Sequence, residues 1–177
     1  MRSSRTFAIT LTGAPPPEFP MAESGNPALF LDLAGTLVKM DETRQLPLDG
    51  NGNIVIELLP GVAEKLRPIR DHLMLVFTNQ AGIKRGRLTT AKVEAALLEL
   101  DHQLGDILSG WLVCPHDDDD RCECRKPKSG MIAELAETFG VDLQASTGVG
   151  DQAVDEQACK AGGVGRFVYA KDFFGWK

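Results

Sequence analysis

The sequence has no apolar run that approaches the roughly 18 residues of a membrane-spanning helix. It also has no surplus of basic residues, because 19 lysines and arginines stand against 25 aspartates and glutamates, a formal net charge of −6. An acidic chain lacks the basic surface that attracts nucleic acids and anionic membranes. We therefore expect neither partner, and the 177 residues have the length of one globular domain.

Cysteine is scarce, and its distribution is not that of a disulfide framework. Cys114, Cys122 and Cys124 crowd into eleven residues beside His116, whereas Cys159 stands apart and is expected to fill the core. Such crowding is typical of metal binding in a reducing compartment, which predicts a cytoplasmic protein. Three thiolates and one imidazole form a closed tetrahedral set, so we predict a structural zinc site. The acidic run 117–120 inside this loop is expected to be a solvated turn.

The first 27 residues carry little of a folded pattern. A secretory signal needs an apolar stretch and a small-residue cleavage site. The stretch 7–11 is too short for that role and is broken by threonines, and a run of three prolines follows it. We expect a disordered tail over 1–27 and one folded domain over 28–177. An organellar transit peptide is the less favoured interpretation of the tail.

From residue 28 onward, short apolar runs alternate with stretches of helical period. This pattern predicts strands over 28–31, 73–77, 111–113, 146–149 and 166–169, and helices opening at 60 and running over 90–104, 129–139 and 153–161. The alternation indicates an α/β fold with a Rossmann-like parallel sheet and helices on both faces. The polar segment 41–53 is expected to be a hairpin or loop. In such sheets, ligands bind beyond the carboxyl ends of the strands.

Several chemistry-bearing side chains follow the predicted strands. Asp32 is a candidate nucleophile, since carboxylates accept phosphoryl groups. Thr78 offers a hydroxyl to a phosphate oxygen, and Lys126 offers a cation for the charge of a transferring phosphoryl group. Asp151 and Asp155 supply the hard oxygen ligands that Mg²⁺ prefers. Together they predict phosphate chemistry at one edge of the sheet.

The order of these residues resembles a known superfamily. Asp-x-x-Gly-Thr from residue 32, Thr-Asn-Gln from 78, Cys-Arg-Lys-Pro from 124 and Gly-Asp-x-x-x-Asp from 150 form the four-part pattern of the haloacid dehalogenase superfamily. The stretch 78–86 and the Cys-Pro-His and Cys-Glu-Cys-Arg-Lys-Pro motifs resemble the zinc-containing subfamily of histidinol-phosphate phosphatases and heptose 1,7-bisphosphate 7-phosphatases. The resemblance implies a capless core, with only 41 residues between Thr36 and Thr78.

The resemblance also implies the role of each residue. Asp32 becomes an aspartyl phosphate, while Thr78 and Lys126 hold the phosphoryl oxygens. Mg²⁺ is held by Asp32, Asp151 and the backbone carbonyl of Ala34. Further residues complete the implied site: Asp155 supports the metal from outside its direct ligands or through water, and the substrate contacts are Asn79, Arg125 and Arg85.

One position departs from the family pattern. The second aspartate of the first motif, which acts as general acid and base, is Ala34 here. General acid–base catalysis contributes about 100- to 10,000-fold. The protein is therefore expected to be a slow phosphatase that uses another base, for which Asp41 and Glu42 are candidates. Alternatively, it is a phosphotransferase or a binding protein with impaired catalysis. A third alternative is that Ala34 is a deliberate substitution. Phosphonoacetaldehyde hydrolase also carries alanine here, but it needs a cap lysine for which this chain has no room.

We accordingly expect magnesium-dependent hydrolysis of a small phosphomonoester, such as a sugar phosphate. The alternative is a catalytically impaired binding or regulatory protein, or a phosphotransferase, on the same scaffold. The sequence carries no signal for an oligomeric state.

Overall fold

The computed structural model describes residues 8–10 and 25–177. Six strands form one sheet in the order β1-β4-β3-β2-β5-β6, and every neighbouring pair is parallel. The strands are β1 (Ala8–Thr10), β2 (Ala28–Leu31), β3 (Leu73–Asn79), β4 (Gly110–Cys114), β5 (Thr147–Gly150) and β6 (Arg166–Tyr169). The parallel sheet predicted from the alternation of strands and helices is therefore confirmed.

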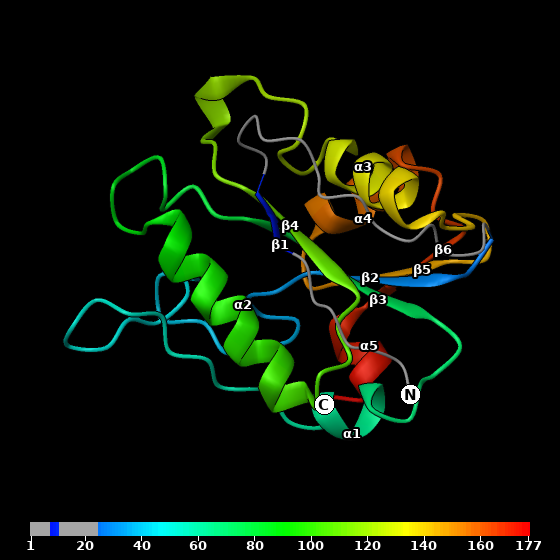
Figure 1. Ribbon diagram of the computed structural model, residues 1–177, viewed down its shortest axis with the longest axis horizontal. Helices are drawn as coiled ribbons and strands as arrows, with labels where there is room; N and C mark the ends of the chain where they lie inside the picture. Colours follow the sequence, from blue (N-terminus) through cyan, green and yellow to red (C-terminus); the bar gives the residue numbers. More distant parts are fainter. Residues whose placement is uncertain (1–7, 11–24) are drawn as a thin grey trace.

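Helices cover both faces of the sheet, as predicted (Figure 1). The helices are α1 (Val62–Leu66), α2 (Thr90–Leu104), α3 (Gly130–Phe139), α4 (Ala153–Ala161) and α5 (Ala170–Phe174), with a 3-10 turn η1 at Asp118–Asp120. Thr89 caps α2 by accepting a hydrogen bond from the backbone N–H of Lys92. Ser129 precedes α3, but its side chain makes no capping bond. The elements β1, η1 and α5 were not predicted from the sequence.

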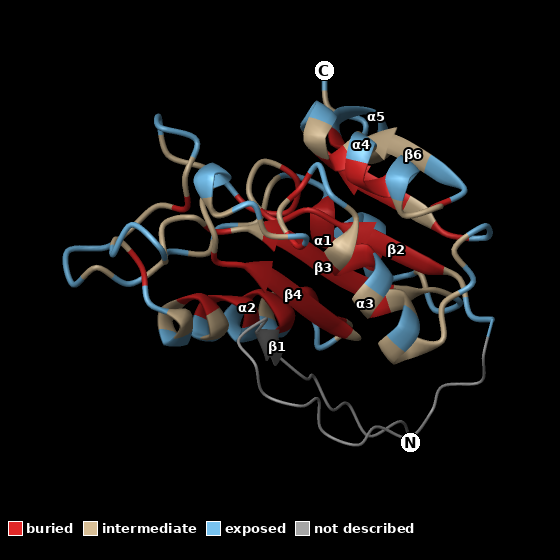
Figure 2. Ribbon diagram, turned by 90° about the horizontal axis from the view of Figure 1, so that it is seen from above, coloured by how far each residue is buried: buried red, intermediate tan, exposed pale blue. Residues whose placement is uncertain are grey.

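The core is divided in two by the sheet, which is buried on both faces (Figure 2). Along β2, Leu29 and Leu31 face the cluster that contains α1 and α2, whereas Ala28 and Phe30 face the cluster that contains α3 and α4. Side chains alternate between the faces of a strand, so a strand covered on both sides must be apolar throughout. This requirement explains the short, continuously apolar runs of the sequence.

The loop between β2 and α1 holds no helix among residues 32–61, which agrees with a core that lacks a cap. Two isolated antiparallel bridges, Val38 with Leu58 and Leu48 with Ile54, fold this loop back on itself. The turn signal at 49–52 lies at its tip, where Asp49 and Gly52 are joined by a backbone hydrogen bond of 3.0 Å. The loop therefore borders the carboxyl edge of the sheet.

The tail predicted over 1–27 lies largely outside the described residues. Residues 8–10 form the edge strand β1 beside β4, and the described fold resumes at residue 25. Within the described ranges, no helix is long and apolar enough to cross a bilayer.

Candidate active site

The strand ends bring the predicted residues to one cleft. Asp32 directly follows β2, Thr78 lies near the end of β3, and Asp151 directly follows β5. The backbone N–H of Asp32 donates to the carbonyl of Val149, which ties the ends of β2 and β5 together. A cleft of about 480 Å³ opens here, and its lining includes Asp32, Ala34, Thr78, Asn79, Arg85, Arg125, Lys126 and Asp155.

Lys126 is the buried centre of the cleft, with only 5% of its surface exposed. Its Nζ donates to Asp32 Oδ1 at 2.6 Å, to Asp155 Oδ1 at 2.7 Å and to the carbonyl of Phe77 at 3.2 Å. Burial alone would lower the pKa of Lys126, but the charges of Asp32 and Asp155 outweigh burial and raise that pKa. The ammonium therefore stays charged between the two carboxylates.

Asp32 is as deeply buried as the lysine. Burial raises the pKa of Asp32 to about 7, against the opposing charge of Lys126. Its Oδ2 accepts a hydrogen bond from Thr36 Oγ1 at 3.3 Å. Both carboxylate oxygens thus point at donors that fix the side chain toward the cleft.

Three carboxylates, those of Asp32, Asp151 and Asp155, form a cluster in which one oxygen from each lies within 4.8 Å of the others. Asp155 is oriented by the N–H of Gln152, which donates to its Oδ2 at the start of α4. Asp151 Oδ1 is a buried oxygen for which the described residues provide no hydrogen-bond partner. Buried oxygens of this kind require a partner, and a Mg²⁺ ion, which prefers carboxylate ligands, fits this one.

Gly35 shapes the same corner of the cleft. Its backbone φ is +83°, a conformation that glycine adopts without strain. A Cβ at this position would lie 2.6 Å from Met40 Cε and 2.7 Å from Asp151 Oδ2, so a side chain does not fit. The glycine of the first motif is therefore required for the close approach of Asp151.

Asn79 and Thr78, which are neighbours at the end of β3, have different hydrogen-bond partners. Asn79 lines the cleft, but its side-chain amide exchanges two hydrogen bonds with the backbone of Lys126, at 3.0 and 3.1 Å. Asn79 therefore positions the lysine. The Thr78 hydroxyl is buried and accepts from the side chain of Gln80 at 3.0 Å.

The two arginines predicted to bind substrate are paired within the protein. Arg85 donates two hydrogen bonds to the Asp117 carboxylate, at 2.5 and 2.6 Å, and these hold the pKa of Asp117 at about 2. Arg125 Nε donates to Asp118 at 2.6 Å. With Lys84 bound to Asp120 as well, the acidic run is a solvent-accessible turn in which three of the four aspartates are ion-paired.

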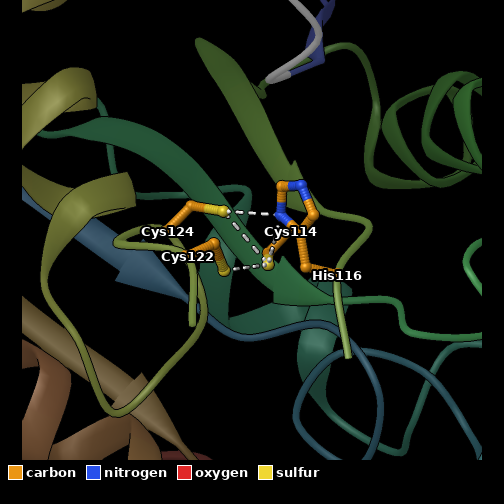
Figure 3. Close-up of side chains that lie close together, drawn as sticks. All are labelled: Cys114, His116, Cys122 and Cys124. Carbon is orange, nitrogen blue, oxygen red and sulfur yellow. Dashed lines mark hydrogen bonds between the residues drawn. The ribbon is translucent and has the colours of Figure 1, made fainter. Parts of the chain in front are cut away.

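The cysteine loop brings its four predicted ligands together (Figure 3). Cys114 comes from the end of β4, and His116, Cys122 and Cys124 come from the loop before α3. The sulfur atoms and His116 Nδ1 lie 3.2 to 3.7 Å apart in the pairs that touch. Four ligands around a tetrahedral zinc are spaced by roughly 3.5–3.8 Å, given Zn–S bonds of about 2.3 Å and Zn–N bonds of about 2.0 Å. The cluster therefore fits zinc.

Asp41 and Glu42, the two carboxylates considered as replacements for the missing acid, are not among the described residues that line the cleft. Asp41 Oδ1 instead accepts hydrogen bonds from Thr43 and Gln45 and organises its own loop. The same loop places Arg44 in the cleft, with its guanidinium 2.8 Å from Asp151 Oδ2. Sequence reasoning missed Arg44, because an arginine in a polar loop without periodicity carries no recognisable signal.

Comparison with known proteins gives consistent relatives. The sequence family described as polynucleotide kinase 3 phosphatase matches residues 28–169. The D-glycero-beta-D-manno-heptose-1,7-bisphosphate 7-phosphatase of Salmonella typhi is 33% identical over 157 residues, which are 82% of this chain and 80% of that protein. The corresponding protein of Yersinia pestis is 32% identical over the same fraction of each chain.

Solved structures of similar proteins share the fold. The D,D-heptose 1,7-bisphosphate phosphatase of B. bronchiseptica, complexed with magnesium and phosphate, superposes with a TM-score of 0.70 at 28% identity and covers 79% of this chain and 78% of its own. A haloacid dehalogenase-like protein of Mesorhizobium loti has a TM-score of 0.69 at 27% identity, covering 84% and 73% of the two chains.

Proposed function

Since the chain belongs to the haloacid dehalogenase superfamily, within the family of polynucleotide kinase 3 phosphatases and heptose bisphosphate phosphatases, we propose that it is a magnesium-dependent phosphatase of a small phosphomonoester. One observation carries the proposal. The Nζ of Lys126 bridges Asp32 and Asp155 in a buried cleft that Thr78 also lines. This arrangement offers a carboxylate nucleophile beside a cation and a hydroxyl that can hold a phosphoryl group.

In this proposal, a carboxylate oxygen of Asp32 attacks the phosphorus while the ester oxygen leaves with the electron pair of the broken P–O bond. The Thr78 hydroxyl and the Lys126 ammonium bind the phosphoryl oxygens and offset their negative charge. Water then attacks the phosphorus of the aspartyl phosphate, breaks its bond to Asp32 and releases inorganic phosphate. Asn79 supports this chemistry by fixing the backbone of Lys126.

Magnesium, when bound, neutralises charge on the transferring phosphoryl group. Asp32, Asp151 and the backbone carbonyl of Ala34 would hold it, and Asp155 would support the site from outside these ligands. The orphaned, buried Oδ1 of Asp151 supports this assignment. The solved relative that contains magnesium and phosphate supports it as well.

Asp151→Asn should weaken Mg²⁺ binding at least about tenfold, because the amide lacks the charge of the carboxylate and offers only one acceptor oxygen. Isothermal titration calorimetry with MgCl₂ measures the change. Asp172→Asn, which alters an exposed aspartate on α5, is the matched control and should bind Mg²⁺ like the wild type. Equal affinity in both variants would remove Asp151 from the metal site.

The zinc site has a supporting role in this proposal. Zinc bound by Cys114, His116, Cys122 and Cys124 closes the loop that ends immediately before Arg125 and Lys126. A closed four-ligand site is structural, since no position is left for a reacting molecule. Because the site needs thiolates, the protein is expected to work in a reducing compartment.

Relatives named as heptose bisphosphate phosphatases support a phosphorylated sugar, or a metabolite of similar size, as the substrate. The cleft volume of about 480 Å³ is within the usual range for small-molecule sites. Arg85 and Arg125 remain candidates for contacts with the distal part of the substrate, in exchange for their present partners Asp117 and Asp118. We assign the catalytic domain to residues 28–177.

Ala34 favours a second candidate function. A methyl group neither protonates a leaving oxygen nor activates water, so the same scaffold can serve as an impaired binding or regulatory protein, or as a phosphotransferase from a long-lived aspartyl phosphate.

A panel of metabolite phosphates separates these functions. We expect the purified wild type to release inorganic phosphate from at least one metabolite phosphate in MgCl₂, and EDTA to abolish the release. If the wild type turns over nothing while Ala34→Asp does, the impaired-protein function is correct. If neither protein turns over any phosphate ester, the phosphatase proposal is wrong.

A further inference from the structure

The loop that carries Arg44 is built to hold that side chain in place. Asp41 Oδ1 accepts hydrogen bonds from the N–H and the hydroxyl of Thr43, and the N–H of Arg44 donates to the carbonyl of Asp41. The buried Leu46 and a hydrogen bond from Arg87 to its carbonyl anchor the end of the loop.

Arg44 itself has a positive φ of +61°, which is unusual for a residue with a side chain. Non-glycine residues held in this conformation recur at functional positions. The backbone conformation of Arg44 sets the direction in which its side chain leaves the loop, toward Asp151.

The side chain of Arg44 meets the corner of the cleft beside residue 34. Its NH2 group donates to Asp151 Oδ2, the same oxygen that a Cβ at Gly35 would meet at 2.7 Å. The other oxygen of Asp151, Oδ1, is the buried one without a hydrogen-bond partner among the described residues. Asp151 can therefore bind a metal through Oδ1 and Arg44 through Oδ2 at the same time. Ala34 and Arg44 both line the cleft. Arg44 thus meets Asp151 next to Gly35, the residue that follows Ala34, the position at which the family motif carries its acid.

The carboxylates of the cleft are already committed to other partners. Asp32 and Asp155 share Lys126, and Asp118 binds Arg125. The described residues lining the cleft include no histidine, cysteine, glutamate or tyrosine. The guanidinium of Arg44 has five N–H donors, of which the contact with Asp151 uses one, and its side chain is half-exposed.

We propose that Arg44 stabilises the departing oxygen as an anion, and that the site is therefore selective for phosphates whose leaving group is an acidic oxygen, such as a phenol, an enol or a carboxylic acid. This inference rests on the proposed phosphatase function. Asp32 attacks the phosphorus, the P–O bond breaks, and the leaving oxygen keeps the electron pair without receiving a proton from the protein. The guanidinium supplies the opposite charge, and solvent protonates the product after release.

Three esters of similar size test this selectivity: para-nitrophenyl, phenyl and benzyl phosphate, in order of falling leaving-group acidity. The measured quantity is kcat/KM in saturating MgCl₂, because it reports the steps up to the loss of the leaving group. We expect a steep fall from para-nitrophenyl to benzyl phosphate in the wild type. In Ala34→Asp, which adds an acid, the ratio of the two should shrink by about 100- to 10,000-fold, mainly through faster cleavage of benzyl phosphate.

Arg44 variants test the role of the guanidinium itself. Arg44→Gln should lower kcat/KM for benzyl phosphate by about 10- to 100-fold. This loss is smaller than the roughly 10²- to 10³-fold loss of rate that follows removal of a fully buried donor to a developing anion. The loss for para-nitrophenyl phosphate should be smaller still. Arg44→Lys should recover part of the loss. Arg166→Ala, at the opposite end of the sheet, is the matched control and should change nothing. The Mg²⁺ affinity of each variant is measured in parallel.

The outcomes are distinct. A wild type that cleaves benzyl and para-nitrophenyl phosphate at similar rates overturns the selectivity but leaves the phosphatase function standing. Equal losses for all three esters in Arg44→Gln, together with weaker Mg²⁺ binding, overturn the role on the leaving group and show that Arg44 only orients Asp151. If only Ala34→Asp is active, Arg44 does not replace the acid. If neither protein cleaves any ester, this inference and the phosphatase function both fail.

Discussion

Asp32→Asn should reduce phosphate release by roughly 10⁴-fold or more, the order lost when a nucleophile that works in concert with other groups is removed. The amide is a poor nucleophile and carries no charge to attack phosphorus. It also faces Lys126, whose Nζ now donates to Asp32 Oδ1 at 2.6 Å. Initial rates with the best substrate of the panel, in MgCl₂, measure the loss.

The fold of this variant has to be verified, because removing one partner of a buried ion pair costs about 3–5 kcal/mol when the other charge is left alone. Here Lys126 keeps its contact with Asp155, so the protein should still fold, as circular dichroism and a thermal melt would show. Asp119→Asn changes an exposed aspartate of η1 and should retain full activity. A folded Asp32→Asn with wild-type rates would mean that the carboxylate is not the nucleophile.

Cys114→Ser should remove zinc and with it most of the activity. The sulfur of Cys114 is fully buried and lies 3.2 Å from that of Cys124 and 3.7 Å from that of Cys122, so a hydroxyl cannot replace it in the cluster. A metal present at about 1,000 times its dissociation constant stabilises a protein by about 4 kcal/mol. At about 2–4 °C per kcal/mol for a chain of this size, the thermal midpoint should fall by roughly 8–16 °C.

Metal analysis decides this prediction directly. The wild type should contain about one zinc per chain and Cys114→Ser close to none. Cys159→Ser is the matched control, because Cys159 is also fully buried but lies on α4, outside the cluster. The control should keep its zinc even if it loses some stability. A full zinc content in Cys114→Ser would rule out the four-ligand site.

The sequence was sufficient to predict the parts of the site that follow from strand ends. Asp32, Thr78 and Asp151 each follow or end a strand, and parallel strands place those ends at one edge. The clustering of Cys114, His116, Cys122 and Cys124 was predictable too, because their spacing is local. Lys126 lies 94 residues from Asp32, and its place beside that carboxylate could be inferred only from the motif order.

The remaining contacts were not predictable, for physical reasons. The contact of Arg44 with Asp151 depends on a positive φ in an irregular loop, and no residue pattern fixes that angle for an arginine. The pairing of Arg85 with Asp117 joins two loops whose paths are set by tertiary packing. Asn79 lines the cleft, and its amide also binds the backbone of Lys126, a contact that only the packed geometry reveals.

The position of β2 has a consequence for the synthesis of the protein. This strand lies at the centre of the main sheet, between β3 and β5, and the N–H of Ala28 binds a hydroxyl 118 residues further along the chain. A growing chain therefore carries β2 with one open edge until β5 has left the ribosome, and such long-range pairing is slow to form. During that interval the nascent chain is exposed to aggregation through this edge. It also lacks Asp151, so Asp32, the proposed nucleophile, is synthesised long before the cleft is complete.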